Sequence, residues 1–404
     1  MEQTWRWFGP TDPISLDQIR QSGATGIVSA IHENYRGQPW TEAEVAGRKA
    51  EIEAAGLTWS VVESIPVTDA VKRRTADWQR DVEAYCTTLR RVASAGVRTV
   101  CYNFMPVVDW TRTDLTYRLD NGSAALRFDI AEFAAYDVFV LRRPDARDDY
   151  ADAVLAKAER LAGRFDDETI ARLEATIIQG LPGAEGGHDR DGIRARIESY
   201  GDLDDATFRA NLIAFLEVVV PVAAAEGVRL GIHPDDPPYS LFGLPRVVST
   251  IEDCRTLLDA VPDPANGITY CAGSFGSRPD NDLVAMARVL APRVHFAHLR
   301  LVTLEEDGSF FEDEHLRAGS PLVDLVRVLM AEEARRAAAG AGERSIPMRP
   351  DHGALFDADA YAALPGYSWI GRLKGLAELR GVAHAVDRFG LADPTLIAAD
   401  YIRV

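Results

Sequence analysis

The chain has 404 residues, of which 47% are hydrophobic and 26% are charged, a composition typical of a soluble globular protein. It carries 44 Lys and Arg against 62 Asp and Glu, a net charge of −18. That balance argues against a nucleic-acid or anionic-membrane surface, because phosphate binding needs local positive charge. The four cysteines are scattered without CxxC spacing, which indicates reduced thiols in a cytoplasmic protein.

The N-terminus has no basic stretch followed by an apolar core, so we expect no secretory signal. The longest apolar run, near 218–225, is too short to span a bilayer and predicts no membrane contact.

Short apolar segments alternate with helical ones over the first hundred residues. The helices predicted at 41–55 and 78–95 each end at a glycine, Gly56 and Gly96. Strands that alternate with helices of this length indicate parallel βαβ units. The four strands predicted in this part of the chain lie at 5–8, 26–32, 57–64 and 97–104.

The alternation breaks between Pro106 and about Asp205. This stretch holds several aromatic residues and a charged, helix-like segment at 149–179. A structureless loop of such length is uncommon inside a compact domain. We therefore expect a mostly helical insertion, residues 107–205, after the fourth strand.

The alternation then resumes and completes eight strand–helix units, the number that closes a (β/α)8 TIM barrel. We therefore expect one α/β domain over residues 1–404, a TIM barrel that contains the insertion. The last four strands are predicted at 228–232, 267–271, 294–298 and 346–349.

Four side chains at the ends of these last four strands point to a metal site: His233, Cys271, His298 and Asp351. The active sites of such barrels are built at the carboxyl ends of the strands, so these groups are expected to meet at one rim. Two imidazoles, a thiol and a carboxylate can hold a divalent ion, and their softness alone does not choose between Fe²⁺, Mn²⁺, Co²⁺ and Zn²⁺. Each residue alone has a plainer interpretation, such as a core histidine or a helix cap. Their shared position favours the metal, and the other cysteines and the histidines apart from His352 are interpreted as structural.

Further polar groups near the strand ends are predicted to bind substrate. Asn103 and Asp235 follow the fourth and fifth strands, Arg300 follows the seventh, and Arg349 ends the eighth. Arginine suits a carboxylate, and amides and carboxylates suit hydroxyl groups, so this rim suits a polyhydroxy acid. The alternative for each residue is a salt bridge within the rim.

Beyond these patterns, the chain resembles the mannonate dehydratase family of hexuronate degradation, the UxuA type. The resemblance runs almost end to end and includes the blocks RWFGPTDPISL, TVCYNFMPVVDWTRTDL, NGITYCAGSFG, HFAHLR and IPMRPDHG. It implies a TIM barrel with a helical insertion and a homo-oligomer, either a dimer or a tetramer. It also implies a Mn²⁺- or Fe²⁺-dependent hydro-lyase that converts D-mannonate to 2-keto-3-deoxy-D-gluconate in glucuronate degradation. The family's metal ligands match His233, Cys271, His298 and Asp351, and its catalytic imidazole and phenol match His352 and Tyr367.

The implied reaction needs a base for the proton at C2 and an acid for the hydroxyl that leaves C3. The sequence leaves open which of His352 and Tyr367 is which, and our interpretation assigns Tyr367 to C2 and His352 to the hydroxyl. A dehydratase of a related aldonate is one alternative, and a metal-dependent sugar isomerase on a similar barrel is another. The isomerase is disfavoured because no lysine follows any of the late strands. A catalytically silent barrel that only binds a sugar acid is a third.

Overall fold

The structure is a computed structural model that describes residues 1–404 apart from 32–37, 178–188, 202, 341–344, 360–363 and 399–404. Eight parallel strands close into a barrel in the order β1-β12-β9-β8-β7-β4-β3-β2. The TIM barrel predicted from the sequence is therefore confirmed. The barrel strands are β1 (Glu2–Arg6), β2 (Gly26–Ser29), β3 (Thr58–Glu63), β4 (Thr99–Tyr102), β7 (Arg229–Ile232), β8 (Asn266–Cys271), β9 (Val294–His298) and β12 (Pro347–Arg349).

Most of the barrel strands are rich in apolar residues, as expected for strands whose two faces are both buried. Every residue of β4, β8 and β9 is buried. Val28, Val61, Cys101 and Phe296 form one contact cluster contributed by four different strands. The first strand begins three residues before the prediction, since pairing of β1 with β12 starts at Glu2.

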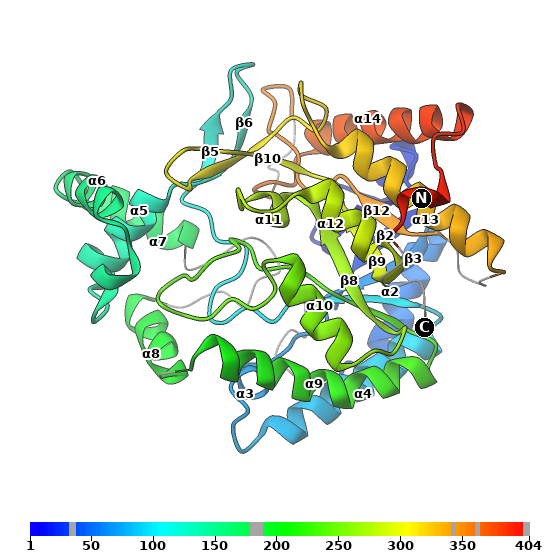
Figure 1. Ribbon diagram of the computed structural model, residues 1–404, viewed down its shortest axis with the longest axis horizontal. Helices are drawn as coiled ribbons and strands as arrows, with labels where there is room; N and C mark the ends of the chain where they lie inside the picture. The colour runs from blue at the N-terminus through cyan, green and yellow to red at the C-terminus, as the bar shows by residue number, and fades with distance from the viewer. Residues whose placement is uncertain (32–37, 178–188, 202, 341–344, 360–363, 399–404) are drawn as a thin grey trace.

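Helices surround the barrel (Figure 1), and several of them begin with a side-chain cap. At α2, Thr41 accepts a hydrogen bond from the Glu44 backbone N–H, and the Glu44 carboxylate accepts one from the Thr41 backbone, which is a capping box. Gly56 and Gly96 follow α2 and α4 with φ of 75° and 89°, a left-handed conformation that glycine adopts without strain. The barrel helices are α1 (Leu16–Gln21), α2 (Glu42–Ala54), α3 (Asp69–Lys72), α4 (Trp78–Ser94), α9 (Asp205–Ala225), α10 (Ile251–Ala260), α11 (Ala272–Gly276), α12 (Leu283–Leu290), α13 (Leu322–Ala338) and α14 (Trp369–Arg388). Short 3₁₀ turns lie at Ala291–Arg293 and Pro394–Leu396.

Between β4 and β7 the chain forms α5 to α8, which lie to one side of the barrel (Figure 1). This segment also contains a hairpin, β5 and β6, that the sequence interpretation did not include. The hairpin joins β10 and β11 in an antiparallel sheet of order β10-β11-β6-β5, which we call the second sheet. The limits 107–205 of the insertion stay a prediction. The elements are β5 (Asp114–Arg118), β6 (Ala124–Phe128), α5 (Ile130–Ala135), a π-helical segment (Tyr136–Leu141), a 3₁₀ turn (Ala146–Asp149), α6 (Asp152–Ala162), α7 (Asp167–Ile177), α8 (Arg190–Tyr200), β10 (Leu301–Leu304) and β11 (Phe310–Asp313).

Helix α9 is long and apolar enough to cross a membrane by length and composition alone. In the structure it runs along α4 on the outside of the barrel (Figure 1), with the Phe215 ring 5.1 Å from that of Tyr85. The buried Asn211 amide donates to the Lys72 carbonyl at 3.1 Å. These contacts are those of an outer helix of a barrel, and the fold is that of a soluble protein.

Candidate metal centre and active site

Three of the predicted metal ligands lie together at the carboxyl rim of the barrel. The ligand atoms of His233, Cys271 and His298 all lie within 4.8 Å of one another, and all three side chains are buried. The closest pair is His233 Nε2 and His298 Nδ1, at 3.2 Å. We call these three residues the His/Cys/His cluster.

The barrel topology brings the cluster together. Cys271 ends β8, His298 ends β9, and the two residues stand opposite each other in the register of these neighbouring strands. His233 directly follows β7, the other neighbour of β8. Carboxyl ends of parallel strands meet at one edge, so residues far apart in sequence converge here.

Asp351, the fourth predicted ligand, follows β12 and lies beside the cluster. Its Oδ2 is 3.8 Å from His298 Nδ1 and 4.0 Å from Cys271 Sγ. The same carboxylate contacts Arg300 Nε at 2.7 Å and Arg349 NH1 at 2.5 Å. Asp351 has a φ of 66°, a strained conformation for a non-glycine residue that is typical of functional sites.

The electrostatics favour the metal-binding forms of Cys271 and His298, whereas at His233 burial lowers the pKa but the negative charge of a Cys271 thiolate outweighs it and raises the pKa overall. Burial raises the pKa of the Cys271 thiol, but the positive charge of Arg300 and contact with His233 outweigh it, and the pKa is lowered overall. Burial, helped by the charge of Arg349, holds the pKa of His298 well below its usual value. A thiolate and a neutral imidazole are the species that coordinate metals. The donor set of one sulfur, two ring nitrogens and a carboxylate oxygen thus fits a divalent transition-metal ion.

The two predicted catalytic residues lie side by side. The rings of His352 and Tyr367 meet edge to face with centroids 5.0 Å apart, and both side chains are buried. Burial raises the pKa of Tyr367 to about 12, so the phenol is protonated at neutral pH. The Arg372 guanidinium lies 5.2 Å from the centre of the Tyr367 ring.

The second sheet contributes a carboxylate to this pair. Glu312 of β11 lies with Oε1 2.7 Å and Oε2 2.9 Å from Nδ1 of His352. Glu312 also pairs with Arg112 at 3.0 Å and with Arg300 at 2.8 Å. Both arginines also pair with Asp236, so two buried cations and two buried carboxylates alternate beside the catalytic pair.

Glu312 and Arg112 were missed as site residues by the sequence interpretation. Arg112 stands in the block WTRTDL, where it was considered only as part of the insertion. Glu312 lies on a strand that was not predicted, and nothing in its local sequence marks it. Asp236, which directly follows Asp235, was not predicted as a site residue.

The predicted substrate-binding residues have different surroundings. The Asp235 carboxylate accepts hydrogen bonds from the Val248 backbone at 2.7 Å and the Ser249 hydroxyl at 2.9 Å, so it holds the loop after β7. Asn103 donates to Asp109 at 3.3 Å.

The two predicted arginines lie at the cluster itself. Arg349 donates from Nε to His298 Nε2 at 3.1 Å and pairs with Glu63 at 3.1 Å. Arg300 pairs with Asp351 and Glu312, as described above. Substrate contact by any of the four residues stays a prediction.

A closed parallel barrel with a buried His/Cys/His cluster at its carboxyl rim defines the class of this protein: a TIM-barrel enzyme with a candidate metal centre. A family model described as D-mannonate dehydratase (UxuA) matches residues 1–391. The chain belongs to this family.

Individual relatives agree with that assignment. A mannonate dehydratase of Saccharophagus degradans is 53% identical over 389 residues, which cover 96% of this chain and 98% of that protein. Mannonate dehydratase 2 of Agrobacterium fabrum is 54% identical over 390 residues, with the same two coverages. The crystal structure of mannonate dehydratase from Streptococcus suis serotype 2 matches with a TM-score of 0.75 and 30% identity, covering 99% of this chain and 97% of that one.

Proposed function

We propose that the protein is a mannonate dehydratase, a hydro-lyase that converts D-mannonate to 2-keto-3-deoxy-D-gluconate and water. The observation that carries the proposal is the convergence of the His/Cys/His cluster with Asp351, next to the pair His352 and Tyr367. Membership of the family over nearly the whole chain supports the same reaction.

The metal that we propose is Mn²⁺ or Fe²⁺, held by His233, Cys271, His298 and Asp351. A divalent ion at this position would supply positive charge beside the substrate carboxylate, where negative charge develops when C2 loses its proton. Arg300 and Arg349 both contact Asp351. We propose that they orient this carboxylate as a ligand and bind the carboxylate end of the substrate.

The reaction removes the proton from C2 and the hydroxyl group from C3, which leaves an enol that ketonises to the 2-keto-3-deoxy acid. A carboxylate in contact with Nδ1 of a histidine fixes the orientation of the imidazole ring, which a proton-transfer group needs. We therefore assign His352, with Glu312 at 2.7 Å, to protonation of the departing hydroxyl. That assignment leaves Tyr367 for the proton at C2, which the phenol can take only as phenolate, and the positive charges of Arg349 and of a bound divalent ion would favour that form.

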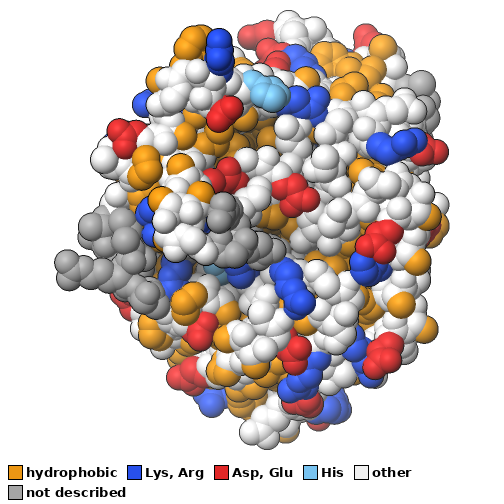
Figure 2. Space-filling model, turned by 90° about the vertical axis from the view of Figure 1, so that its right-hand side faces the viewer, with side chains coloured by type: hydrophobic (Ala, Val, Ile, Leu, Met, Phe, Trp, Pro, Cys, Tyr) orange, Lys and Arg blue, Asp and Glu red, His pale blue; other side chains and the backbone are white. Residues whose placement is uncertain are grey.

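The proposal includes a cytoplasmic enzyme that forms a dimer or a tetramer and binds neither nucleic acid nor membrane. All four cysteines are buried and unpaired, as suits a reducing compartment. On the face in Figure 2, lysine and arginine side chains are interspersed with aspartate and glutamate and form no basic patch. Light scattering on the purified protein measures the oligomer.

Turnover on D-mannonate tests the proposed function. We expect the protein with added Mn²⁺ or Fe²⁺ to form 2-keto acid from D-mannonate, and a chelator to abolish this. D-gluconate and aldoses, assayed in parallel, separate a dehydratase of a related aldonate and a sugar isomerase from the proposed enzyme. Isomerisation of aldoses without 2-keto acid from any aldonate would overturn the proposal.

A further inference from the structure

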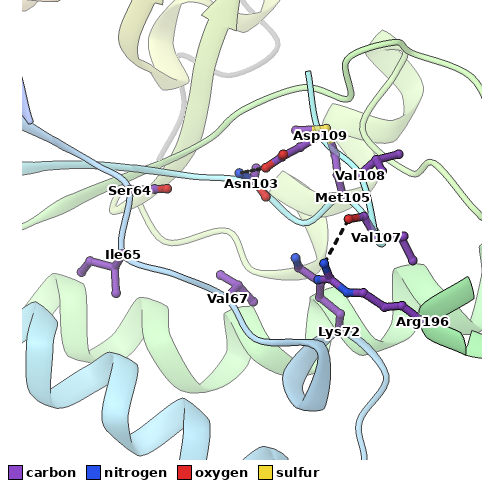
Figure 3. Close-up of a pocket in the computed structure, with 10 residues that line it drawn as sticks. All are labelled: Ser64, Ile65, Val67, Lys72, Asn103, Met105, Val107, Val108, Asp109 and Arg196. Carbon is purple, nitrogen blue, oxygen red and sulfur yellow. Dashed lines mark hydrogen bonds between the residues drawn. The ribbon is translucent and has the colours of Figure 1, made fainter. Parts of the chain in front are cut away.

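A small pocket lies at the rim of the barrel on the side of β3 and β4 (Figure 3). Ser64 and Asn103 directly follow these two strands, and the loop 105–109 forms another wall. Lys72 of α3 and Arg196 of α8 complete the pocket, which we call the Lys72 pocket.

The Lys72 pocket adjoins the His/Cys/His cluster through its walls. Ser64 follows Glu63, whose carboxylate is 3.5 Å from Nε2 of His298. Asn103 follows Tyr102, whose carbonyl accepts a hydrogen bond from the His233 backbone at 2.7 Å.

The loop 105–109, another wall of the pocket, also leads to the cluster. It leads into Trp110, whose ring centroid is 5.2 Å from that of His233. The Lys72 pocket and the His/Cys/His cluster therefore occupy neighbouring parts of the same rim.

The pocket contains a buried cation, Lys72, whose positive charge lowers the pKa of Asp69 without a direct hydrogen bond to it. Lys72 is only 4% exposed, and its ammonium makes no hydrogen bond or ion pair with any residue that the structure describes. The second cation, Arg196, already binds Asp69 at 2.7 Å and 3.0 Å and the Val107 carbonyl at 3.2 Å. A buried ammonium without a hydrogen-bond acceptor is costly, so its position points to a ligand that contacts it.

The lining of the pocket indicates the chemistry of that ligand. Lys72 offers three N–H donors, Asn103 an amide and Asp109 a carboxylate, a mixture that suits hydroxyl groups, which both donate and accept. Ile65, Val67 and other apolar side chains form the rest of the surface and suit a carbon chain.

We propose that the Lys72 pocket, which has room for about one water-sized group, receives a distal hydroxyl of the sugar acid, and that Lys72 Nζ donates a hydrogen bond to its oxygen. The inference rests on the proposed function and deepens it: Lys72 selects for the length of the aldonate. No proton transfer is assigned to Lys72.

Two acids test this role. D-mannonate reaches the pocket, whereas a four-carbon aldonate with the same configuration at C2 and C3 lacks the distal carbons. We expect Lys72→Met to lower kcat/KM for D-mannonate about 10- to 100-fold, the range for a hydrogen bond to a charged group. The inhibition constant of the four-carbon acid should change less than 3-fold, because that acid does not touch Lys72.

Controls separate this role from a structural one. Lys49→Met removes a lysine from the outer face of α2, where it pairs with Glu53, and should leave both constants unchanged. In Lys72→Met, the bound metal and the melting temperature should match those of the wild type. Lys72→Gln keeps a hydrogen-bond donor and should recover part of the lost kcat/KM. It also replaces Lys72→Met in the test if the methionine variant does not fold.

Three outcomes would overturn the inference. Unchanged kcat/KM for D-mannonate in Lys72→Met would remove the contact, and an equal loss for both acids would give Lys72 a structural role. A wild-type protein that dehydrates no aldonate would instead refute the proposed function itself, and the length selection with it.

Discussion

The barrel and the second sheet differ in what they contribute to the site. The barrel brings a sulfur and two ring nitrogens together at the ends of three adjacent strands. The second sheet brings a carboxylate, Glu312, against the imidazole of His352. The barrel therefore builds the candidate metal centre, and the second sheet orients His352, the residue that we assign to proton transfer. Metal binding and proton transfer should be separable by mutation.

The largest effect is expected at the barrel rim. Cys271→Ser and Asp351→Asn each remove a proposed ligand, so bound metal should fall well below one ion per chain. Turnover on D-mannonate should then drop by about 10³-fold or more, since a metal supplies several kcal/mol of charge stabilisation. Elemental analysis of the purified variants measures the metal, and Cys254→Ser, at a buried thiol of α10, is the matched control. Full metal and full turnover in Cys271→Ser would exclude the thiol as a ligand.

The next effect concerns the catalytic pair. His352→Asn and Tyr367→Phe should each lower kcat at least ~10²-fold, the usual contribution of a general acid or base, while metal content stays at the wild-type level. Steady-state kinetics and elemental analysis on the same samples measure both quantities. Wild-type rates in both variants would remove these residues from the mechanism.

A smaller effect should come from the second sheet. Glu312→Gln keeps the shape of the side chain but removes the charge beside His352, and turnover should fall about 10- to 100-fold, as for other partners that orient a functional histidine. Glu305→Gln, whose carboxylate pairs with Arg127 of β6, should behave as the wild type. A Glu312→Gln protein that loses its metal would show that the two regions are not separable.

The smallest effect is expected where α8 meets α3. Asp69 accepts hydrogen bonds from Arg196 and Tyr200, and although burial raises its pKa, these partners and Lys72 lower it to about 2. A carboxyl group whose pKa is lower in the folded state stabilises the protein above the unfolded pKa, and this contribution is lost as pH falls through the folded pKa.

Asp69→Asn should therefore lower the free energy of unfolding by about 1–2 kcal/mol at pH 7. The difference from the wild type should shrink as pH falls from about 4 to about 2, measured by urea unfolding. A difference that stays constant over this range would mean that the charge of Asp69 contributes nothing.

The same two regions show how much the sequence could predict. Most barrel strands are short apolar runs between helices, so local periodicity predicts them. The count of strands and the family resemblance then each place the metal ligands at the carboxyl rim. The sequence shows two adjacent aspartates and does not indicate their different partners. Asp235 accepts a hydrogen bond from its own loop, whereas Asp236 pairs with Arg112 and Arg300.

The second sheet has no such local signal. It pairs β11 with β6, and Phe310 stands opposite Phe128, 182 positions away in the sequence. Two of its strands, β5 and β11, are five and four residues long and carry charged side chains, so they resemble the surrounding loops. The contact between Glu312 and His352 therefore depends on tertiary structure alone.

The proposed function depends most directly on one divalent ion that occupies the His/Cys/His cluster and is needed for turnover. Elemental analysis and D-mannonate turnover should be measured on the same protein as purified, after chelation, and after Mn²⁺ or Fe²⁺ is restored. We predict close to one ion per chain, loss of activity with the ion, and recovery of both together. Undiminished turnover in metal-free protein would contradict the account.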